Sequence, residues 1–233
     1  MIVREGLSII FIMLCLTVVV LLLASRFDSR ILACAAALFA LLTVFTVFFF
    51  RDPARNFDGE PGMLVSPADG RILSVEKIEH HDFIGGPAWK VSIFLSVFDV
   101  HVNRIPCTGS IDYVKYNPGK FFKAFLDKAS DENEHTEIGM TTPTGQHLIV
   151  KQIAGLIARR IVCRLHPDDQ VTTGARFGLI KFGSRTELLV PIDSKILVAE
   201  GDHVKGGATV IGKLVEAMGT DLSDSSQAHN VEL

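Results

Sequence analysis

The chain has 233 residues, a hydrophobic share of 48% and a formal net charge of −3, which leaves room for one sizeable domain plus additional segments. This weakly acidic balance provides no electrostatic basis for binding nucleic acid, so no nucleic-acid partner is expected. The four cysteines include no Cys-x-x-Cys pair, which argues against a zinc site or a disulfide framework and favours a reducing compartment.

The excess of apolar residues lies in the first fifty positions. Leu7–Leu23 and Ile31–Phe50 contain no charged residue, and the second run is long enough to cross a hydrocarbon core of about 30 Å as a helix. Because only a short polar break separates the two runs, residues 1–50 are predicted to form a helical hairpin that anchors the chain in a membrane. Two alternatives remain open for the first run: a cleaved signal peptide, or an interfacial helix beside a single span.

The cationic residues around these runs predict an orientation. Arg4, Arg51 and Arg55 flank the outer ends, whereas the connection carries Arg26 and Arg30. The positive-inside rule therefore places both ends, and the rest of the chain, in the cytoplasm. The expected location is the cell (inner) membrane, with the following domain facing the cytoplasm.

Short β-like runs separated by Gly, Pro and Asp begin at Met63. The strongest strand signal is Val91–Phe98, which is largely apolar and is expected to be central. Lys120–Ser130 has phenylalanines at helical spacing and is predicted to be a helix. Residues 51–216 are thus expected to form one domain, and the polar residues 217–233 a flexible tail. The fold class is α+β and mainly β.

An internal repeat lies on both sides of the best candidate for chemistry. Asp169–Phe177 recurs as Asp202–Val210, thirty-three residues later, with Gly174 and Gly207 at matching positions. Each copy predicts a strand, a tight turn and a second strand, with glycine supplying the dihedral angle of the turn. Similar units build the flattened barrels of biotinyl and lipoyl carrier domains. A compact domain resembling a β-barrel or sandwich is therefore expected.

Between the two copies stands Gly183-Ser184, flanked by strand-like runs. Such a pair is typical of an ordinary turn. In a strained turn, however, the Ser184 hydroxyl can attack the Gly183 carbonyl and move the acyl group from nitrogen to oxygen. β-Elimination of the ester then breaks the chain and converts Ser184 into a pyruvoyl group. Glycine suits the acyl side because it has no Cβ to crowd the reacting carbon.

The surrounding motif, Lys181-Phe182-Gly183-Ser184-Arg185 followed by an apolar run and Pro191, resembles the self-cleavage site of the phosphatidylserine decarboxylases, and the shorter prokaryotic branch matches best. Several long motifs in register are a specific signal. Further blocks resemble the family in the family's own order: Ser66–Gly70, Phe98–Arg104, Tyr116–Phe121, Leu126–Ser130 and Gln152–Arg160.

The resemblance implies a carboxy-lyase that converts phosphatidylserine into phosphatidylethanolamine and CO2 through a Schiff base to a pyruvoyl group derived from Ser184. Self-cleavage between Gly183 and Ser184 would leave a large subunit of residues 1–183 and a small subunit of residues 184–233. The implied partners are a membrane phospholipid substrate and the lipid bilayer. Whether the chain also forms a homo-oligomer is left open.

The same resemblance implies roles for individual residues. His101 would act as the general acid–base, and Asp69 would orient it in a triad with Ser184. In the longer branch of the family, the histidine assigned to self-cleavage matches the position of Arg104, which cannot act as a base. Either His101 serves both steps or another group assists cleavage. Thr186-Glu187 also departs from the family, which usually has a Val-Asp-like pair.

Three cations are candidates for binding the lipid phosphate or the serine carboxylate, with ordinary surface charges as the alternative: Arg104, Lys120 and Arg185. No metal site is expected, because the adjacent side chains of His80 and His81 would diverge on a strand.

Two other functions are weighed against this one. The substrate could be another serine-headed lipid or a soluble amino acid, although the membrane segments argue against the soluble case. The chain could instead be a membrane-tethered, biotinyl-like β module without catalysis. Such a carrier needs a modifiable lysine at a hairpin tip, typically beside methionine, and Lys205-Gly206-Gly207 is a poor match.

Overall fold

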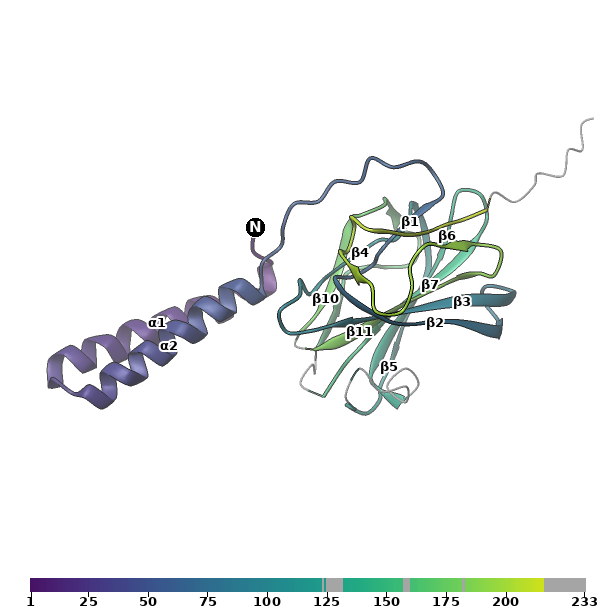
Figure 1. The fold of residues 1–233 in the computed structure, drawn as a ribbon. Coiled ribbons are helices and arrows are strands. Elements are labelled where there is room, and N and C mark those ends of the chain that lie inside the picture. Colours follow the sequence, from purple (N-terminus) through teal and green to yellow (C-terminus); the bar gives the residue numbers. More distant parts are fainter. Residues whose placement is uncertain (123, 125–131, 157–159, 182, 216–233) are drawn as a thin grey trace, which may run out of the picture.

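The computed structural model describes the whole chain except residues 123, 125–131, 157–159, 182 and 216–233. Two antiparallel helices, α1 (Arg4–Phe27) and α2 (Arg30–Phe49), form a hairpin that projects away from a β domain (Figure 1). Asp28 has a left-handed φ of 46° and ends α1, and the Ser29 side chain caps α2 by accepting from the Leu32 amide. Both helices are long and apolar enough to cross a membrane, so the expected pair of N-terminal apolar helices is present.

The open end of the hairpin faces the β domain (Figure 1). The Val3 amide donates to the Phe50 carbonyl at 3.0 Å, and Ile2 forms an antiparallel bridge with Arg51. A Cβ built on Gly6 would lie 2.4 Å from the Phe50 ring, so glycine allows α1 to approach Phe50 closely. The hairpin is therefore closed at its base by the residues that lead into the β domain.

The β domain is organised by one antiparallel sheet of eight strands, in the order β13-β2-β3-β11-β7-β6-β5-β9. In chain order these strands are β2 (Gly70–His81), β3 (Gly86–Leu95), β5 (Gly109–Asn117), β6 (His135–Thr141), β7 (His147–Ile153), β9 (Gln170–Val171), β11 (Ser184–Pro191) and β13 (His203–Val204). The sheet curls as a half-barrel but does not close, which corrects the expected barrel or sandwich. Among the described strands, β9 pairs only with β5 and β13 only with β2, and each has two residues, so the two edges do not join.

Two small sheets of three strands complete the domain, with the orders β1-β14-β12 and β4-β10-β8. Their strands are β1 (Met63–Val65), β4 (Val102–Arg104), β8 (Ile161–Cys163), β10 (Arg176–Ile180), β12 (Lys195–Ile196) and β14 (Val210–Lys213).

The internal repeat corresponds to β9-turn-β10 and β13-turn-β14, as predicted. Each copy contributes its first strand to the large sheet and its second strand to a small sheet. The turn glycines Gly174 and Gly207 have φ values of 77° and 69°, which favour glycine at both positions. A Cβ built on Gly207 would lie 3.4 Å from the Gly174 Cα, so the two turns lie against each other.

The strand expected over Val91–Phe98 is β3, which begins earlier, at Gly86, and ends at Leu95. It lies between β2 and β11, inside the large sheet as predicted, and Val91, Ile93 and Leu95 are fully buried in the main core. The helix expected over Lys120–Ser130 falls mostly on residues that the structure does not describe.

Candidate active site

Ser184 is the first residue of β11, and Gly183 precedes it with a left-handed φ of 60°. The strand lies between β3 and β7, and Ser184 pairs with Leu95, the last residue of β3. The Ser184 side chain is fully buried, and its hydroxyl has no hydrogen-bond partner among the described residues. A buried polar group without a partner is uncommon in folded proteins, and here it marks Ser184 as a candidate for chemistry.

The Gly183 carbonyl, which would be attacked in self-cleavage, lies against Gly155. A Cβ built on Gly155 would be only 2.1 Å from the Gly183 oxygen, well below the contact distance of real Cβ atoms. Gly155 is buried two residues beyond the end of β7, the strand that pairs with β11. Only a residue without a side chain can therefore stand beside this carbonyl in its observed position.

His101 directly precedes β4, in the connection that leaves β3 at Leu95, the residue paired with Ser184. Its carbonyl accepts from the amide of Ile180, three residues before Gly183. The histidine and the Gly-Ser pair are thus brought to the same region by β3, β4 and β10, although they are about eighty residues apart in sequence.

The hydrogen bonds of the His101 imidazole favour one neutral tautomer. Its Nδ1 lies 3.0 Å from the Asp99 carbonyl oxygen, which can only accept, so Nδ1 carries the hydrogen of the neutral ring. The remaining nitrogen, Nε2, is buried and has no hydrogen-bond partner among the described residues. Burial lowers the pKa of His101 to about 4, and the charge of Arg51 acts in the same direction. At neutral pH, Nε2 is therefore free to accept a proton.

Phe49, the last residue of α2, packs on this imidazole. The two ring centroids are 4.2 Å apart with an interplanar angle of 36°, and Phe49 is 1% exposed. Phe49 and Phe50 form a small apolar cluster with Leu179 of β10. The base of the hairpin consequently forms part of the shell that keeps water away from His101.

Asp69 is held by residues other than His101. Arg55 donates to both carboxylate oxygens, at 2.7 Å for the contact between Arg55 Nη2 and Asp69 Oδ2, and the Gly206 amide donates to Asp69 Oδ1 at 2.8 Å. No Asp69–His101 hydrogen bond occurs among these contacts of the described chain. The negative charge of Asp69 nevertheless acts to raise the pKa of His101, so the two groups influence each other electrostatically.

The three candidate substrate-binding cations each form an ion pair with a different carboxylate. Arg104 is 3% exposed and donates to Asp52 at 2.9 Å, and its charge is further surrounded by the Pro53 and Gly174 carbonyls. Arg185 is 2% exposed and contacts Glu187 at 2.8 Å. Lys120 is exposed and forms an ion pair with Glu132 at 2.9 Å. The structure brings none of these side chains into contact with Ser184 or His101 within the described residues.

A buried polar network that the sequence reasoning did not identify lies along the Ser184 face of β11. The Asn103 side-chain amide donates to the Thr186 hydroxyl at 3.1 Å, and the Gln152 side chain donates to the Asn103 side-chain oxygen, Oδ1, at 2.8 Å. All three side chains are fully buried. Asn103 and Gln152 belong to two of the family-like blocks, which was the available signal. Phe49 offered no signal, because it stands in a long apolar run.

Comparison with known proteins places these features in a family. The model of the phosphatidylserine decarboxylase family matches residues 42–212. The phosphatidylserine decarboxylase proenzyme of Desulfotalea psychrophila is 48% identical over 178 residues, which cover 76% of this chain and 83% of that protein. The proenzyme of Symbiobacterium thermophilum is 49% identical with the same coverage of both chains. That of Chlorobium chlorochromatii is 44% identical over 86% of this chain and 93% of its own length. The chain belongs to the phosphatidylserine decarboxylase family.

Proposed function

We propose that this protein decarboxylates phosphatidylserine to phosphatidylethanolamine and CO2 at a membrane surface, after self-cleavage between Gly183 and Ser184. The observation that supports this most is the buried Ser184 hydroxyl, which has no hydrogen-bond partner among the described residues and directly follows a glycine with a φ of 60°. Relatives that cover most of the chain are named proenzymes, in agreement with processing.

Self-cleavage begins when the Ser184 oxygen attacks the Gly183 carbonyl carbon. The bond from that carbon to the Ser184 nitrogen breaks, and the hydroxyl proton ends on the freed amine. Loss of the Cα proton then expels the Gly183 carboxylate, which keeps the former Ser184 oxygen. Hydrolysis of the remaining enamine releases ammonia and leaves the pyruvoyl group at the new N-terminus.

The environment of Ser184 fits a pyruvoyl group. The Ser184 side chain is fully buried, and it makes no hydrogen bond within the described structure that the conversion would break. When present, this group would supply the electrophilic carbonyl that binds the substrate amine and would accept the electron pair left on the substrate carbon when CO2 departs. Thr186 and Asn103 extend along the same face of β11 and would hold its position.

We assign the proton transfers to His101. Its Nε2 is unprotonated and free of hydrogen bonds to described residues, so it can take the Ser184 proton before cleavage and return a proton to the substrate carbon later. Arg104, at the position of the second histidine of the longer branch, is buried and paired with Asp52. This supports the use of one histidine for both steps. Asp69 would act on His101 through its charge.

The buried arginines have a structural role in this proposal. Arg104 and Arg185 would have to leave Asp52 and Glu187 in order to bind substrate, and breaking a buried ion pair is costly. Arg104 instead ties the segment that follows the hairpin to β4. The Lys120 side chain is exposed on the surface of the β domain, so it could contact a lipid head group there but not at the buried Ser184.

The small subunit, residues 184–233, would stay bound without a covalent link. β11 pairs with β3 from Ser184 to Pro191 and with β7 from Arg185 to Leu189. β13 and β14, which also belong to this subunit, pair with β2 and β1 of the large subunit, residues 1–183. Residues 51–216 would thus remain one catalytic domain after cleavage.

The hairpin supports a place at the inner membrane with the catalytic domain in the cytoplasm. Both outer helix ends lie beside the β domain, and the flanking cations Arg4 and Arg51 favour the cytoplasmic side (Figure 1). A substrate that stays in the bilayer would then meet the site at head-group depth.

The test is an intact-mass measurement of the purified protein beside a Ser184→Ala variant. We expect two fragments that meet between Gly183 and Ser184, with a pyruvoyl-blocked small fragment, and an uncut variant. Activity on phosphatidylserine, compared with other serine-headed lipids and free serine, then defines the substrate. An uncut, unmodified and folded parent chain would refute the proposal and favour a β module without catalysis.

A further inference from the structure

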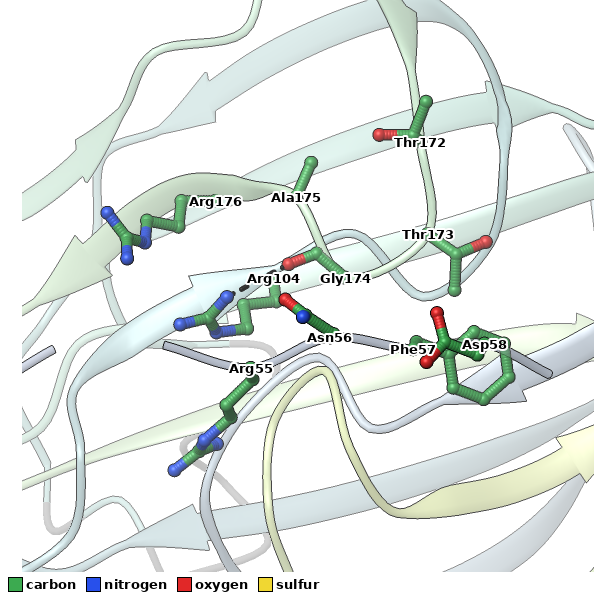
Figure 2. A pocket seen from close by; sticks show the side chains of 10 residues that line it. All are labelled: Arg55, Asn56, Phe57, Asp58, Arg104, Thr172, Thr173, Gly174, Ala175 and Arg176. Atoms are coloured by element: carbon green, nitrogen blue, oxygen red, sulfur yellow. Dashed lines mark hydrogen bonds between the residues drawn. The ribbon is translucent and has the colours of Figure 1, made fainter. Parts of the chain in front are cut away.

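Two surface cavities of the described structure differ in how their charges are used. The first, about 540 Å³, presents three arginines (Figure 2): Arg55, Arg104 and Arg176. All three are already paired, Arg55 with Asp69 and the other two with Asp52. This cavity therefore has little positive charge left for a ligand.

The second cavity, about 530 Å³, lies between the start of α1 and the ends of β8 and β10. The charged groups that face it are Glu5, Arg160, Arg164 and Lys181, and two apolar residues, Ile9 and Val162, form another part of its wall. We call it the basic groove. Its lining combines three cations and one carboxylate with an apolar surface, which suits an anionic amphiphile.

Among the described residues that line the basic groove, the cations outnumber the carboxylates. Glu5 forms an ion pair with Arg164. The Lys181 amide donates to the Arg160 carbonyl at 3.2 Å, which brings these two basic residues together. Burial and the charge of Arg160 lower the pKa of Lys181, while Glu5 opposes this effect. A bound anion would relieve the repulsion between the two cations.

The groove lies at the level where a bilayer surface is expected. Its α1 residues, Glu5, Ser8 and Ile9, belong to the first turns of a helix that is apolar and exposed over most of its length. Cations at the end of such a helix lie in the phosphate layer, and the apolar wall faces the hydrocarbon. The ligand chemistry that fits is a phosphodiester attached to acyl chains.

The groove also adjoins the candidate active site. Lys181 stands two residues before Gly183, and its Nζ lies 5.7 Å from the centroid of the Phe50 ring. Phe50 in turn contacts Phe49, which packs on His101. A lipid with its phosphate in the groove would therefore have its head group close to Ser184 and His101.

We propose that the basic groove binds the phosphodiester of the phospholipid substrate through Arg160, Lys181 and Arg164, with the acyl chains along the hairpin. This inference rests on the proposed function, because it identifies how that substrate is held. The same phosphodiester chemistry could come from anionic lipids of the surrounding bilayer, and the experiment separates these sources.

The experiment uses the full chain in neutral detergent and dihexanoyl-phosphatidylserine, which is soluble as a monomer. Binding is measured by calorimetry in the Ser184→Ala background, where no turnover occurs. Lys181→Gln and Arg160→Gln should each raise Kd roughly threefold to tenfold, because each removes one charge-assisted contact with the phosphate. The control Lys195→Gln removes an exposed cation of β12 that does not belong to the groove lining, and should change Kd less than twofold. Dihexanoylglycerol, which lacks the phosphate, should bind equally to all variants.

Turnover in chains with Ser184 intact adds a second readout. The groove variants should raise KM by the same factor and leave kcat within twofold, with cleavage verified by mass. Equal Kd and KM values for the groove variants and Lys195→Gln would overturn the inference while the proposed function stands. The inference would also be overturned if the groove variants bound phosphatidylglycerol vesicles more weakly but bound dihexanoyl-phosphatidylserine as the parent does. The groove would then bind anionic lipids of the surrounding bilayer. A parent chain without turnover whose lipid binding still depends on the groove would refute the proposed function and leave the binding site in place.

Discussion

Gly155→Ala tests whether the observed packing positions the Gly183 carbonyl for attack. The added Cβ would lie 2.1 Å from the carbonyl oxygen, whereas ordinary contacts begin at 3.4 Å, so the two groups must separate by about 1.3 Å. Neither group is a flexible side chain, because the neighbouring atom is backbone. The displacement therefore falls on the peptide bond that Ser184 would cleave, or on the end of β7.

A misplacement of about 1 Å costs on the order of 100-fold in a reaction that depends on alignment. We accordingly expect self-cleavage of Gly155→Ala to slow by roughly 10- to 100-fold. The assay follows the uncut chain and the two fragments with time by denaturing gel and intact mass, starting from freshly synthesised protein. Thermal unfolding of the same variant in the Ser184→Ala background reports whether the fold is retained.

Gly86→Ala is the matched control, because a Cβ at Gly86 meets no atom within 4 Å. It should be processed at the parental rate. If Gly155→Ala is also cut at the parental rate, the contact with Gly183 does not control the position of the carbonyl. If Gly155→Ala lowers the melting temperature greatly in the uncut background, slow cleavage reflects misfolding, and the positioning argument fails.

The remaining predictions concern the shell of the site. Because the pKa of His101 is lowered to about 4, the unfolded chain binds a proton between pH 6.5 and 4 that the folded chain does not. The free energy of unfolding therefore decreases as the pH is lowered through this window. The parent chain should lose about 2 kcal/mol more of its free energy of unfolding between pH 7 and pH 5 than His101→Gln does, as measured by chemical unfolding. An unchanged pH dependence in the variant would show that His101 is not the source of this loss. Asp52→Asn leaves Arg104 buried beside a neutral group and should lower the free energy of unfolding by about 3 kcal/mol, whereas a change below about 1 kcal/mol would show that the pair is dispensable. Phe49→Ala should admit water to His101 and raise its pKa, so that self-cleavage slows below about pH 6.5, while Phe11→Ala, on an exposed part of α1, should keep the parental pH profile. Identical profiles for the two phenylalanine variants would refute the shielding role.

The hairpin and the repeated strands were predictable because local patterns determine them. An uninterrupted apolar run such as Ile31–Phe50 favours a helix, because a helix satisfies the backbone groups of an apolar segment within the segment itself. The turns at Gly174 and Gly207 were predictable because glycine occupies left-handed φ values without steric cost. The open edge of the large sheet was not, since closure depends on whether the distant strands β9 and β13 meet.

The sequence alone determined the family and the Gly183-Ser184 pair, since both are written in contiguous motifs that need no knowledge of the fold. Only the tertiary structure decided what surrounds that pair. Asp69 binds Arg55 and Gly206, partners separated by 14 and 137 residues, although a triad with His101 was expected. Likewise, Phe49 reaches His101 from the N-terminal helical hairpin. Such contacts depend on the register of strands and on the docking of one element against another, and periodicity along the chain carries no information about either.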